Sequence, residues 1–366
     1  MHPLRPLGPL LVTLLRLLGP LAAALASAAV LDRMCRRKGL LPPGFRAPWR
    51  RLLAGLLLAG ILWLGIFAPL GEIGLPSKLD VSTISTPQLF LLHVLLALSL
   101  LGWFVLGFAG TRPGPPAAAS DSAVDFREPG ARFALPGSEP CSAAGAGPGS
   151  APPLGLELAP GPPPPAARPP APPPSFLSQL ALQLGFRAAH VGREIGLGLL
   201  LGAGAWLVVI VALIVLATVI LAIGGENAMP KQPPAIVPFI ASLPVMVRLA
   251  ASLSAGFVEE TFFRGFLQPR IGIALSTGMF VLAHLSYGQP FVLVGVSLLS
   301  LIYALLVRWR QTIWPAIAAH ALFDGVQLLV IIPAVLRLLG HRGGAAGAKV
   351  LALLAPVAGW AGHHIW

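Results

Sequence analysis

Long apolar runs, separated by short polar stretches, dominate the pattern of hydrophobic and polar positions along the 366-residue chain. A helix needs about 20 mostly apolar residues to cross a bilayer. Three such runs lie at residues 10–31, 52–71 and 88–110. We expect the first to be an uncleaved transmembrane helix rather than a signal peptide, because basic residues follow it directly. The third contains His93, which we interpret as a packed or interfacial side chain.

A second group of apolar runs fills the C-terminal half of the chain. The expected helices lie at residues 195–225, 235–254, 256–268, 271–285, 291–307 and 313–339. Residues 350–366 are apolar but short, so they form either a final partial span or a tail at the membrane interface. The two groups together predict an all-α, polytopic helical membrane protein with about eight transmembrane helices.

Residues 111–180 separate the two groups and differ from both in composition. They contain 19 of the chain's 39 prolines, together with many alanines, glycines and serines. Proline-rich runs favour extended conformations and cannot build a core, so we predict a disordered, flexible linker on the cytoplasmic side. The predicted organisation is an N-terminal membrane region (1–110), the linker (111–180), a second membrane domain (181–345) and an apolar C-terminal tail (346–366).

The overall composition excludes most soluble classes of protein. Hydrophobic residues make up 56% of the chain and charged residues 10%, whereas a soluble domain uses about 25% charged residues to cover its surface. The net charge of +12 does not indicate nucleic-acid binding, because the basic residues lie between apolar runs and mark cytoplasmic loops. The clearest such loop is residues 32–51, with seven basic residues and one acidic residue. The two distant cysteines indicate neither a disulfide framework nor a metal site.

Three carboxylates and two histidines lie inside the C-terminal apolar runs. They are Glu259, Glu260, His284, His320 and Asp324. A charged side chain at the centre of a bilayer costs about 2.5–3.5 kcal/mol on insertion scales. Residues of this kind therefore need compensating partners or a function.

The spacing of these residues along helices predicts how they pair. Glu260 and Arg264 are four residues apart, so they share one helix face and can form an ion pair. Glu259 is rotated by about 100° from Glu260 and has no partner within its own helix, which leaves it available as a general base or acid. His320 and Asp324 also share a face, so Asp324 could orient His320.

The same residue types suit the hydrolysis of an amide bond. That reaction needs a nucleophilic water, a base that takes its proton, and donors or a cation at the developing oxyanion. Glu259 can supply the base, and His284 and His320 can act as donors or metal ligands. Two histidines with a carboxylate, Glu259 or Asp324, can also bind zinc with one coordination position open. Buried pairs can equally hold helices together, but three clusters in one apolar region favour chemistry.

These motifs resemble the CPBP family of intramembrane proteases. That family includes the CAAX prenyl endopeptidase (Ras-converting enzyme) and bacterial proteins tied to bacteriocin processing or self-immunity. Its pattern is Glu-Glu-x-x-x-Arg, then Phe-x-x-x-His, then His-x-x-x-Asn or Asp. In this chain the pattern is Glu259-Glu260 with Arg264, Phe280 with His284, and His320 with Asp324. The resemblance covers roughly residues 190–340 and excludes the three N-terminal helices.

The resemblance implies a helical membrane fold with a polar cavity that opens toward the cytosol, and peptide-bond hydrolysis by an activated water. It implies that Glu259 is the general base and that Glu260 and Arg264 support it. His284 and His320 would then position the water or hold a metal ion. The resemblance fits both a zinc-dependent and a metal-free, glutamate-dependent mechanism, and the sequence does not choose between them.

The last position of the pattern is Asp324 rather than the asparagine of other members. The resemblance implies that this position stabilises the oxyanion, but an ionised aspartate cannot donate a hydrogen bond. Asp324 is therefore protonated, orients His320, or binds a metal ion.

We expect an intramembrane endopeptidase that cleaves a membrane-associated, prenylated or leader-peptide substrate with a glutamate-activated water. Its expected partners are membrane lipid and a peptide or protein substrate in the membrane, and not nucleic acid. We expect it in a bacterial inner (plasma) membrane with the active site toward the cytosol. Two alternatives are a non-catalytic scaffold or bacteriocin-immunity protein of the same fold, and a transporter or proton relay. The sequence shows no pair of related halves that would favour a transporter.

Overall fold

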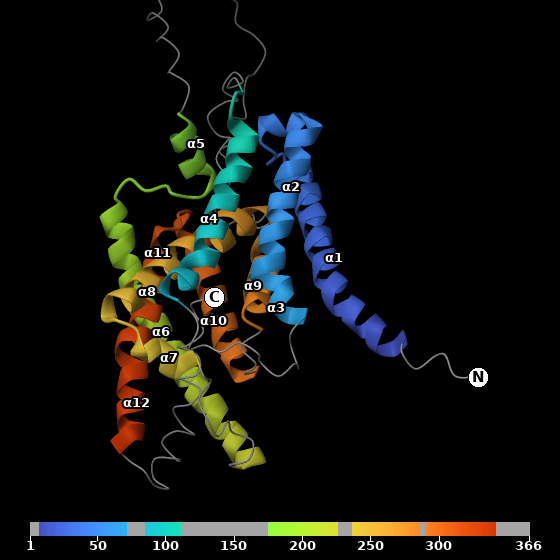
Figure 1. The fold of residues 1–366 in the computed structure, drawn as a ribbon. Helices are drawn as coiled ribbons and strands as arrows, with labels where there is room; N and C mark the ends of the chain where they lie inside the picture. Colours follow the sequence, from blue (N-terminus) through green and yellow to red (C-terminus); the bar gives the residue numbers. More distant parts are fainter. Residues whose placement is uncertain (1–6, 72–84, 112–174, 226–235, 286–289, 342–366) are drawn as a thin grey trace, which may run out of the picture.

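The computed structural model describes residues 7–71, 85–111, 175–225, 236–285 and 290–341. All regular elements in these ranges are helical (Figure 1), and seven stretches there are long and apolar enough to cross a membrane. The predicted all-α, polytopic membrane fold is therefore confirmed. Most of the predicted linker, residues 112–174, and the apolar tail beyond residue 341 lie outside the described residues.

The N-terminal region consists of three long helices with short helical turns between them. Its elements are α1 (Leu7–Arg37), η1 (Pro43–Arg46), α2 (Pro48–Leu62), η2 (Trp63–Phe67), α3 (Ala68–Gly71) and α4 (Thr86–Phe108). Helix α1 continues past the expected end at residue 31, so three arginines of the predicted basic loop lie on its last turns. Asp32 of α1 accepts a hydrogen bond from Arg51 of α2, with 2.7 Å between Oδ1 and Nε. This pair ties the two helices together at their basic ends.

The C-terminal half contains the remaining described elements. They are α5 (Phe176–Gln183), α6 (Val191–Gly224), α7 (Ile236–Ser242), α8 (Val245–Glu260), η5 (Thr261–Leu267), α9 (Gln268–Ala283), α10 (Pro290–Arg310), α11 (Trp314–Val326), η7 (Gln327–Ile331) and α12 (Ile332–His341). Helix α5 begins inside the range assigned to the linker, because Ser175 caps it: the Ser175 hydroxyl accepts a hydrogen bond from the Ser178 amide at 3.2 Å.

The helices that we expected at residues 235–254 and 256–268 are not separate. The chain runs as one helix from Val245 into the π-helical turn η5, because Gly256 serves close packing rather than a break. A Cβ atom at Gly256 would lie 2.8 Å from the backbone nitrogen of Ala321 on α11. The true kink is at Gly272 within α9, whose φ of 84° and ψ of 170° lie outside the helical region that other residues favour.

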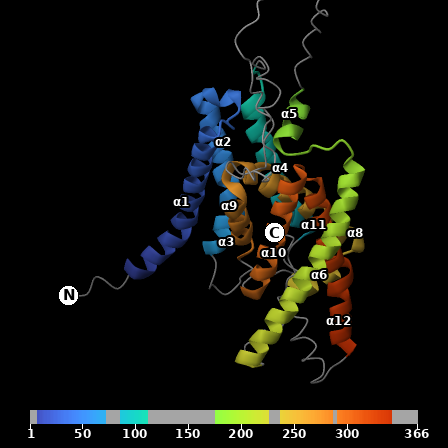
Figure 2. The same ribbon diagram turned by 180° about the vertical axis from the view of Figure 1, so that it is seen from behind.

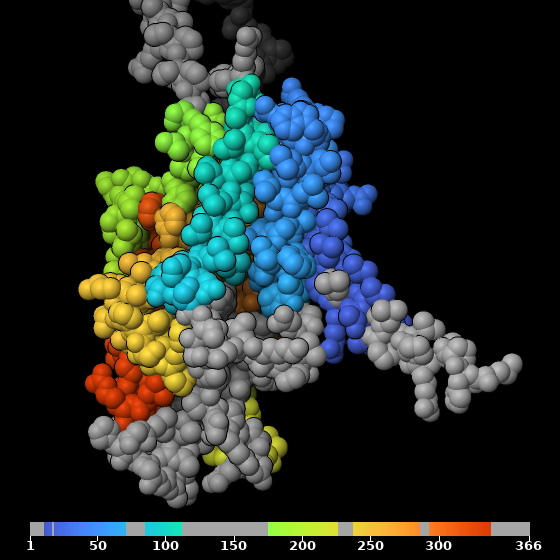
Figure 3. Space-filling view, in the orientation of Figure 1, coloured from blue at the N-terminus to red at the C-terminus, as the bar shows by residue number. Residues whose placement is uncertain are grey.

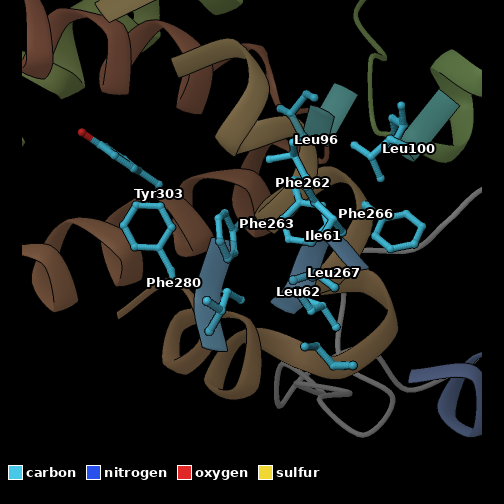
Figure 4. Close-up of a cluster of buried hydrophobic side chains, with 14 of the residues drawn as sticks. Ile61, Leu62, Leu96, Leu100, Phe262, Phe263, Phe266, Leu267, Phe280 and Tyr303 are labelled. Carbon is cyan, nitrogen blue, oxygen red and sulfur yellow. The ribbon is translucent and has the colours of Figure 1, made fainter. Parts of the chain in front are cut away.

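The N-terminal helices pack directly on the C-terminal half. In the space-filling view α2 and α4 lie side by side over one face of the molecule (Figure 3), and α6 crosses the opposite face (Figure 2). Figure 4 shows side chains of α2 and α4 gathered around Phe262 and Phe266 of η5. Trp103 of α4 meets the Phe266 ring edge-on at a centroid distance of 5.0 Å. The aromatic side chains of η5 are therefore shared by both halves of the chain.

Close contacts between small residues join α6 to α11. A Cβ atom at Gly198 would lie 2.4 Å from the Pro315 carbonyl oxygen, and one at Gly202 would lie 2.7 Å from Cα of Ala319. Only glycine permits this approach, which is a common way to pack helices in membranes. The approach fixes α11, the helix that carries His320 and Asp324.

Candidate active site

Glu260 lies at the centre of a fully buried cluster of charged side chains. Its Oε2 is 3.1 Å from Nε of Arg264, one turn later in η5. Its Oε1 is 2.8 Å from Nδ1 of His320, on α11. The other ring nitrogen of His320, Nε2, is 3.4 Å from Oδ2 of Asp324. Both predicted pairs thus form, and Glu260 links them into one network.

Aromatic rings enclose this cluster. The guanidinium carbon of Arg264 lies 4.4 Å from the centroid of the Phe280 ring, and its Nη2 donates to the Ser300 carbonyl at 3.3 Å. The Tyr303 ring of α10 stacks on the His320 imidazole with 5.4 Å between centroids. The side chains of the cluster are almost fully buried, so the ion pairs act in a medium of low dielectric constant.

Glu259 points to the other side of α8, as its position on the helix predicts. Its side chain is 7% exposed, and its Oε1 lies 3.6 Å from Nε2 of His93 on α4. This distance is short enough for an electrostatic attraction but too long for a hydrogen bond. Among the described residues, Glu259 Oε2 has no hydrogen-bond partner. One carboxylate oxygen is therefore left to accept a proton from a ligand or water.

A cavity of about 40 Å³ lies beside Glu259. Its polar walls are Glu259, His93 and His284, and the other lining residues are apolar. A buried water needs roughly 10–15 Å³ of such volume and two to four polar partners. The cavity meets both requirements, so it can hold water next to the Glu259 carboxylate.

The orientation of His284 is set by Phe280. The Nδ1 of His284 is 2.6 Å from the Phe280 carbonyl oxygen, and the two rings stack with 4.4 Å between centroids. A carbonyl oxygen only accepts hydrogen bonds, so Nδ1 carries a hydrogen. In the neutral imidazole Nε2 is then an acceptor, and His284 can hold a water through it.

The six predicted site residues therefore fall into two neighbouring groups. Glu260, Arg264, His320 and Asp324 form the closed network, while Glu259 and His284 line the cavity. Sequence reasoning missed that His93 lines the cavity. The side chain is packed, as expected, but its neighbours are the polar groups of Ser254 and Glu259. Its own helix offers no charged partner at helical spacing, so no local signal marked it.

Three π-helical turns adjoin these residues. The turn η5 follows Glu260 and contains Arg264, the turn η7 begins three residues after Asp324, and η2 supplies Gly65 and Ile66 to the cavity wall. Single π turns inside α-helices are rare and are frequent at functional sites. Their position here supports the assignment of the cavity and network to one site.

The described residues do not form a metal site. No three His, Cys, Asp or Glu side chains in the described ranges are arranged to hold one ion. His320 directs both ring nitrogens at carboxylates, Nδ1 at Glu260 and Nε2 at Asp324. The donor set thus does not fit the predicted zinc ion, which stays a prediction without structural support.

Comparison with known protein families gives a match over the segment that carries the site. Residues 241–326 match the Rce1-like family. The family is described as type II CAAX prenyl endopeptidase Rce1-like, and this match confirms the family resemblance seen in the motifs. The Rce1-like segment contains all six predicted site residues, from Glu259 to Asp324. His93 lies outside it.

The chain is also similar, over part of its length, to a curated bacterial protein. The uncharacterized protein YpbD of Bacillus subtilis (strain 168) is 30% identical to the chain over 86 residues, which are 23% of the chain. The chain spans 44% of the length of that relative. No solved structure matches the chain.

Proposed function

We propose that this protein is an intramembrane endopeptidase that hydrolyses a peptide bond with a water activated by Glu259. One observation carries the proposal. Within the Rce1-like segment, the buried Glu259 carboxylate has an oxygen with no partner among the described residues, and it faces a water-sized cavity that His284 also lines. A carboxylate in that position can take a proton from water, which is the role of a general base.

The proposed reaction begins with a water held between Glu259 and His284. The water donates one hydrogen to Glu259 Oε2 and the other to His284 Nε2, so that its lone pair faces the scissile carbonyl carbon. As the oxygen–carbon bond forms, Glu259 takes the proton and a tetrahedral intermediate results. When the carbon–nitrogen bond breaks, the same proton passes from Glu259 to the leaving amine. The products are a carboxylic acid and an amine, and the amine takes the acid proton to give a carboxylate and an ammonium group.

The network around Glu260 has a supporting role in this proposal. Arg264 and His320 hold both Glu260 oxygens, so that the last turn of α8 cannot rotate. Asp324 lies at ion-pair distance from His320, which favours the orienting role among the three left open by the sequence. The network fixes the direction in which Glu259 leaves the helix.

The site's surroundings and the Rce1-like match support the proposed substrate class. A site buried among membrane-spanning helices requires a substrate that is itself in or on the membrane, such as a prenylated or leader peptide. Arginines lie at the end of α1, at the start of α2 and at the end of α10. By the positive-inside rule, we propose that these ends lie on the cytoplasmic side of a plasma membrane.

Cleavage by the purified full-length chain tests the proposal. The probes are an internally quenched farnesylated CAAX peptide and a peptide library from a digested bacterial proteome, both in detergent. We expect cleavage by the wild type and a loss of about 10²–10⁴-fold in kcat for Glu259→Gln. Gly204→Ala, an exposed position on α6 with nothing within 4 Å of the added Cβ, is the control and should cleave normally. Equal cleavage by Glu259→Gln would overturn the assignment. Cleavage of neither probe by the wild type would favour the non-catalytic scaffold.

A further inference from the structure

Half of the wall around the proposed catalytic water comes from outside the Rce1-like segment. Ile61, Gly65 and Ile66 belong to α2 and η2, and Leu92, His93 and Leu96 belong to α4. Figure 4 shows Ile61 and Leu96 beside Phe262. Without these helices Glu259 would face lipid or solvent, so the N-terminal region closes the site. His93 is its one polar contribution to the cavity lining.

Two residues of α8 bracket the imidazole of His93. Its Nδ1 lies 2.8 Å from Oγ of Ser254, and its Nε2 lies 3.6 Å from Oε1 of Glu259. The side chain of His93 is buried, with 4% exposed. A histidine of α4 is therefore held at both ring nitrogens by polar atoms of one facing helix.

The partners of His93 determine where its hydrogen lies. An ionised Glu259 carboxylate only accepts, so Nε2 carries the hydrogen that faces it. In the neutral ring Nδ1 is then the acceptor, and Ser254 donates its hydroxyl hydrogen. Ser254 thus selects the tautomer that directs an N–H group at the proposed base.

We propose that His93 is a positioning residue of the active site, which holds the Glu259 carboxylate through Oε1 and leaves Oε2 for the catalytic water. This inference rests on the proposed function. It makes the N-terminal membrane region a part of the catalytic centre rather than an appended anchor. The chemistry requires only that one carboxylate oxygen be fixed by a donor while the other receives the proton.

Three substitutions of His93 separate positioning from packing. Glutamine places its amide nitrogen near the position of Nε2, asparagine places its polar atoms near the position of Nδ1, and leucine fills the space without a donor. We expect His93→Leu and His93→Asn to lower kcat about 10- to 100-fold with little change in KM, because the electrostatic attraction between the Nε2–H group and Glu259 Oε1 is lost. His93→Gln should recover most of the rate.

A purely structural role would give a different pattern. If His93 only packed against α8, His93→Gln and His93→Asn would lower the stability of the protein by similar amounts. The kcat per folded molecule would then stay near the wild-type value. Leu100→Ala is the matched control, since Leu100 is a buried residue of α4 outside the cavity. It should lower the melting temperature without changing kcat. Wild-type kcat in His93→Leu would overturn the proposal.

A double-mutant cycle tests the same contact without any substrate. The melting temperatures of the full-length wild type, His93→Leu, Glu259→Gln and the double variant are compared in detergent. A direct contact predicts that the shift in the double variant differs from the sum of the single shifts, and additive shifts would contradict it. If the wild type cleaved no probe but the shifts were coupled, the proposed protease function would fail while the contact stood. If the wild type cleaved and the shifts were additive, only the role of His93 would fail.

Discussion

The carboxylates of Glu259 and Glu260 leave the same turn of α8 about 100° apart and enter different surroundings. Glu260 has one oxygen 3.1 Å from Arg264 and the other 2.8 Å from His320, with no exposed surface. Glu259 has a looser contact of 3.6 Å with His93 at one oxygen, and a cavity beside its side chain. One side chain is held at both oxygens, and the other is held loosely at one.

This difference indicates how one helix turn can serve structure and chemistry together. A carboxylate with both oxygens paired has no capacity left to take a proton from water, but it fixes the helix on which it lies. A carboxylate with one open oxygen can exchange a proton and needs that fixed helix to keep its direction. Because the two residues are adjacent, the fixed carboxylate of Glu260 lies as near in the chain as possible to the proposed base, Glu259.

The largest expected effect is a difference in the free energy of unfolding between variants of the two glutamates. Glu260→Gln removes the negative partner of the buried Arg264 and should lower the free energy of unfolding by about 3–5 kcal/mol. Glu259→Gln should change it much less, because Glu259 has no close ion pair to lose and a neutral amide costs less to bury than a carboxylate. Thermal or denaturant unfolding in detergent measures both. Adding Arg264→Met to Glu260→Gln should recover part of the loss. Equal destabilisation by the two single variants would contradict the comparison.

A smaller effect is expected from moving α11 against α6. Gly202→Ala would place a Cβ atom 2.7 Å from Cα of Ala319, the neighbour of His320, and overpacking of this kind costs about 1–3 kcal/mol. It should disturb the Glu260 network more than the Glu259 cavity. The matched control on the same helix is Gly204→Ala, whose Cβ meets nothing within 4 Å. It should be neutral or stabilising by about 0.5–1 kcal/mol. Equal melting temperatures of Gly202→Ala and Gly204→Ala would contradict this prediction.

Asp324→Asn should have a still smaller effect. If Asp324 orients His320, the amide oxygen of asparagine can still accept from Nε2, so kcat should fall by less than about tenfold. Asp324→Leu should lower kcat further, because it leaves Nε2 without that acceptor. Steady-state cleavage of the same peptide probes measures both variants. A folded but inactive Asp324→Asn protein would show that the negative charge itself is required, as in a metal ligand.

The smallest expected effect concerns metal. Since no three suitable side chains meet in the described ranges, dialysis against a chelator should leave kcat unchanged. Metal analysis of detergent-purified wild type, His284→Ala and His320→Ala checks this expectation. About one zinc per wild-type chain, lost in both variants, would revive the zinc site and make a carboxylate its third ligand.

Local spacing was enough to predict two residue pairs of the candidate site. The pairs Glu260–Arg264 and His320–Asp324 form because residues four apart share a helix face, whatever the rest of the fold does. The all-α membrane fold followed from the lengths of the apolar runs. These features depend on periodicity within one helix, which the sequence contains in full.

The features that the sequence did not reveal depend on contacts between distant segments. His93 and Ser254 are 161 residues apart, and nothing within either helix identifies the other. Gly256 and Gly272 also look alike in the sequence, yet one permits close approach to α11 and the other kinks α9 at φ 84°. Only the packing of neighbouring helices distinguishes the two uses of glycine.

The pairing within the site also has a consequence for biogenesis. During synthesis α1 to α4 emerge first, so His93 is already in place when Glu259 reaches the membrane. Glu260 enters with Arg264 one turn behind it, and the last pair, His320 with Asp324, arrives together on α11. The two glutamates of α8 thus enter the bilayer with a partner beside them or already there, which lowers the cost of inserting them. The order of helices along the chain is therefore an assembly order in which neither Glu259 nor Glu260 enters lipid without a partner.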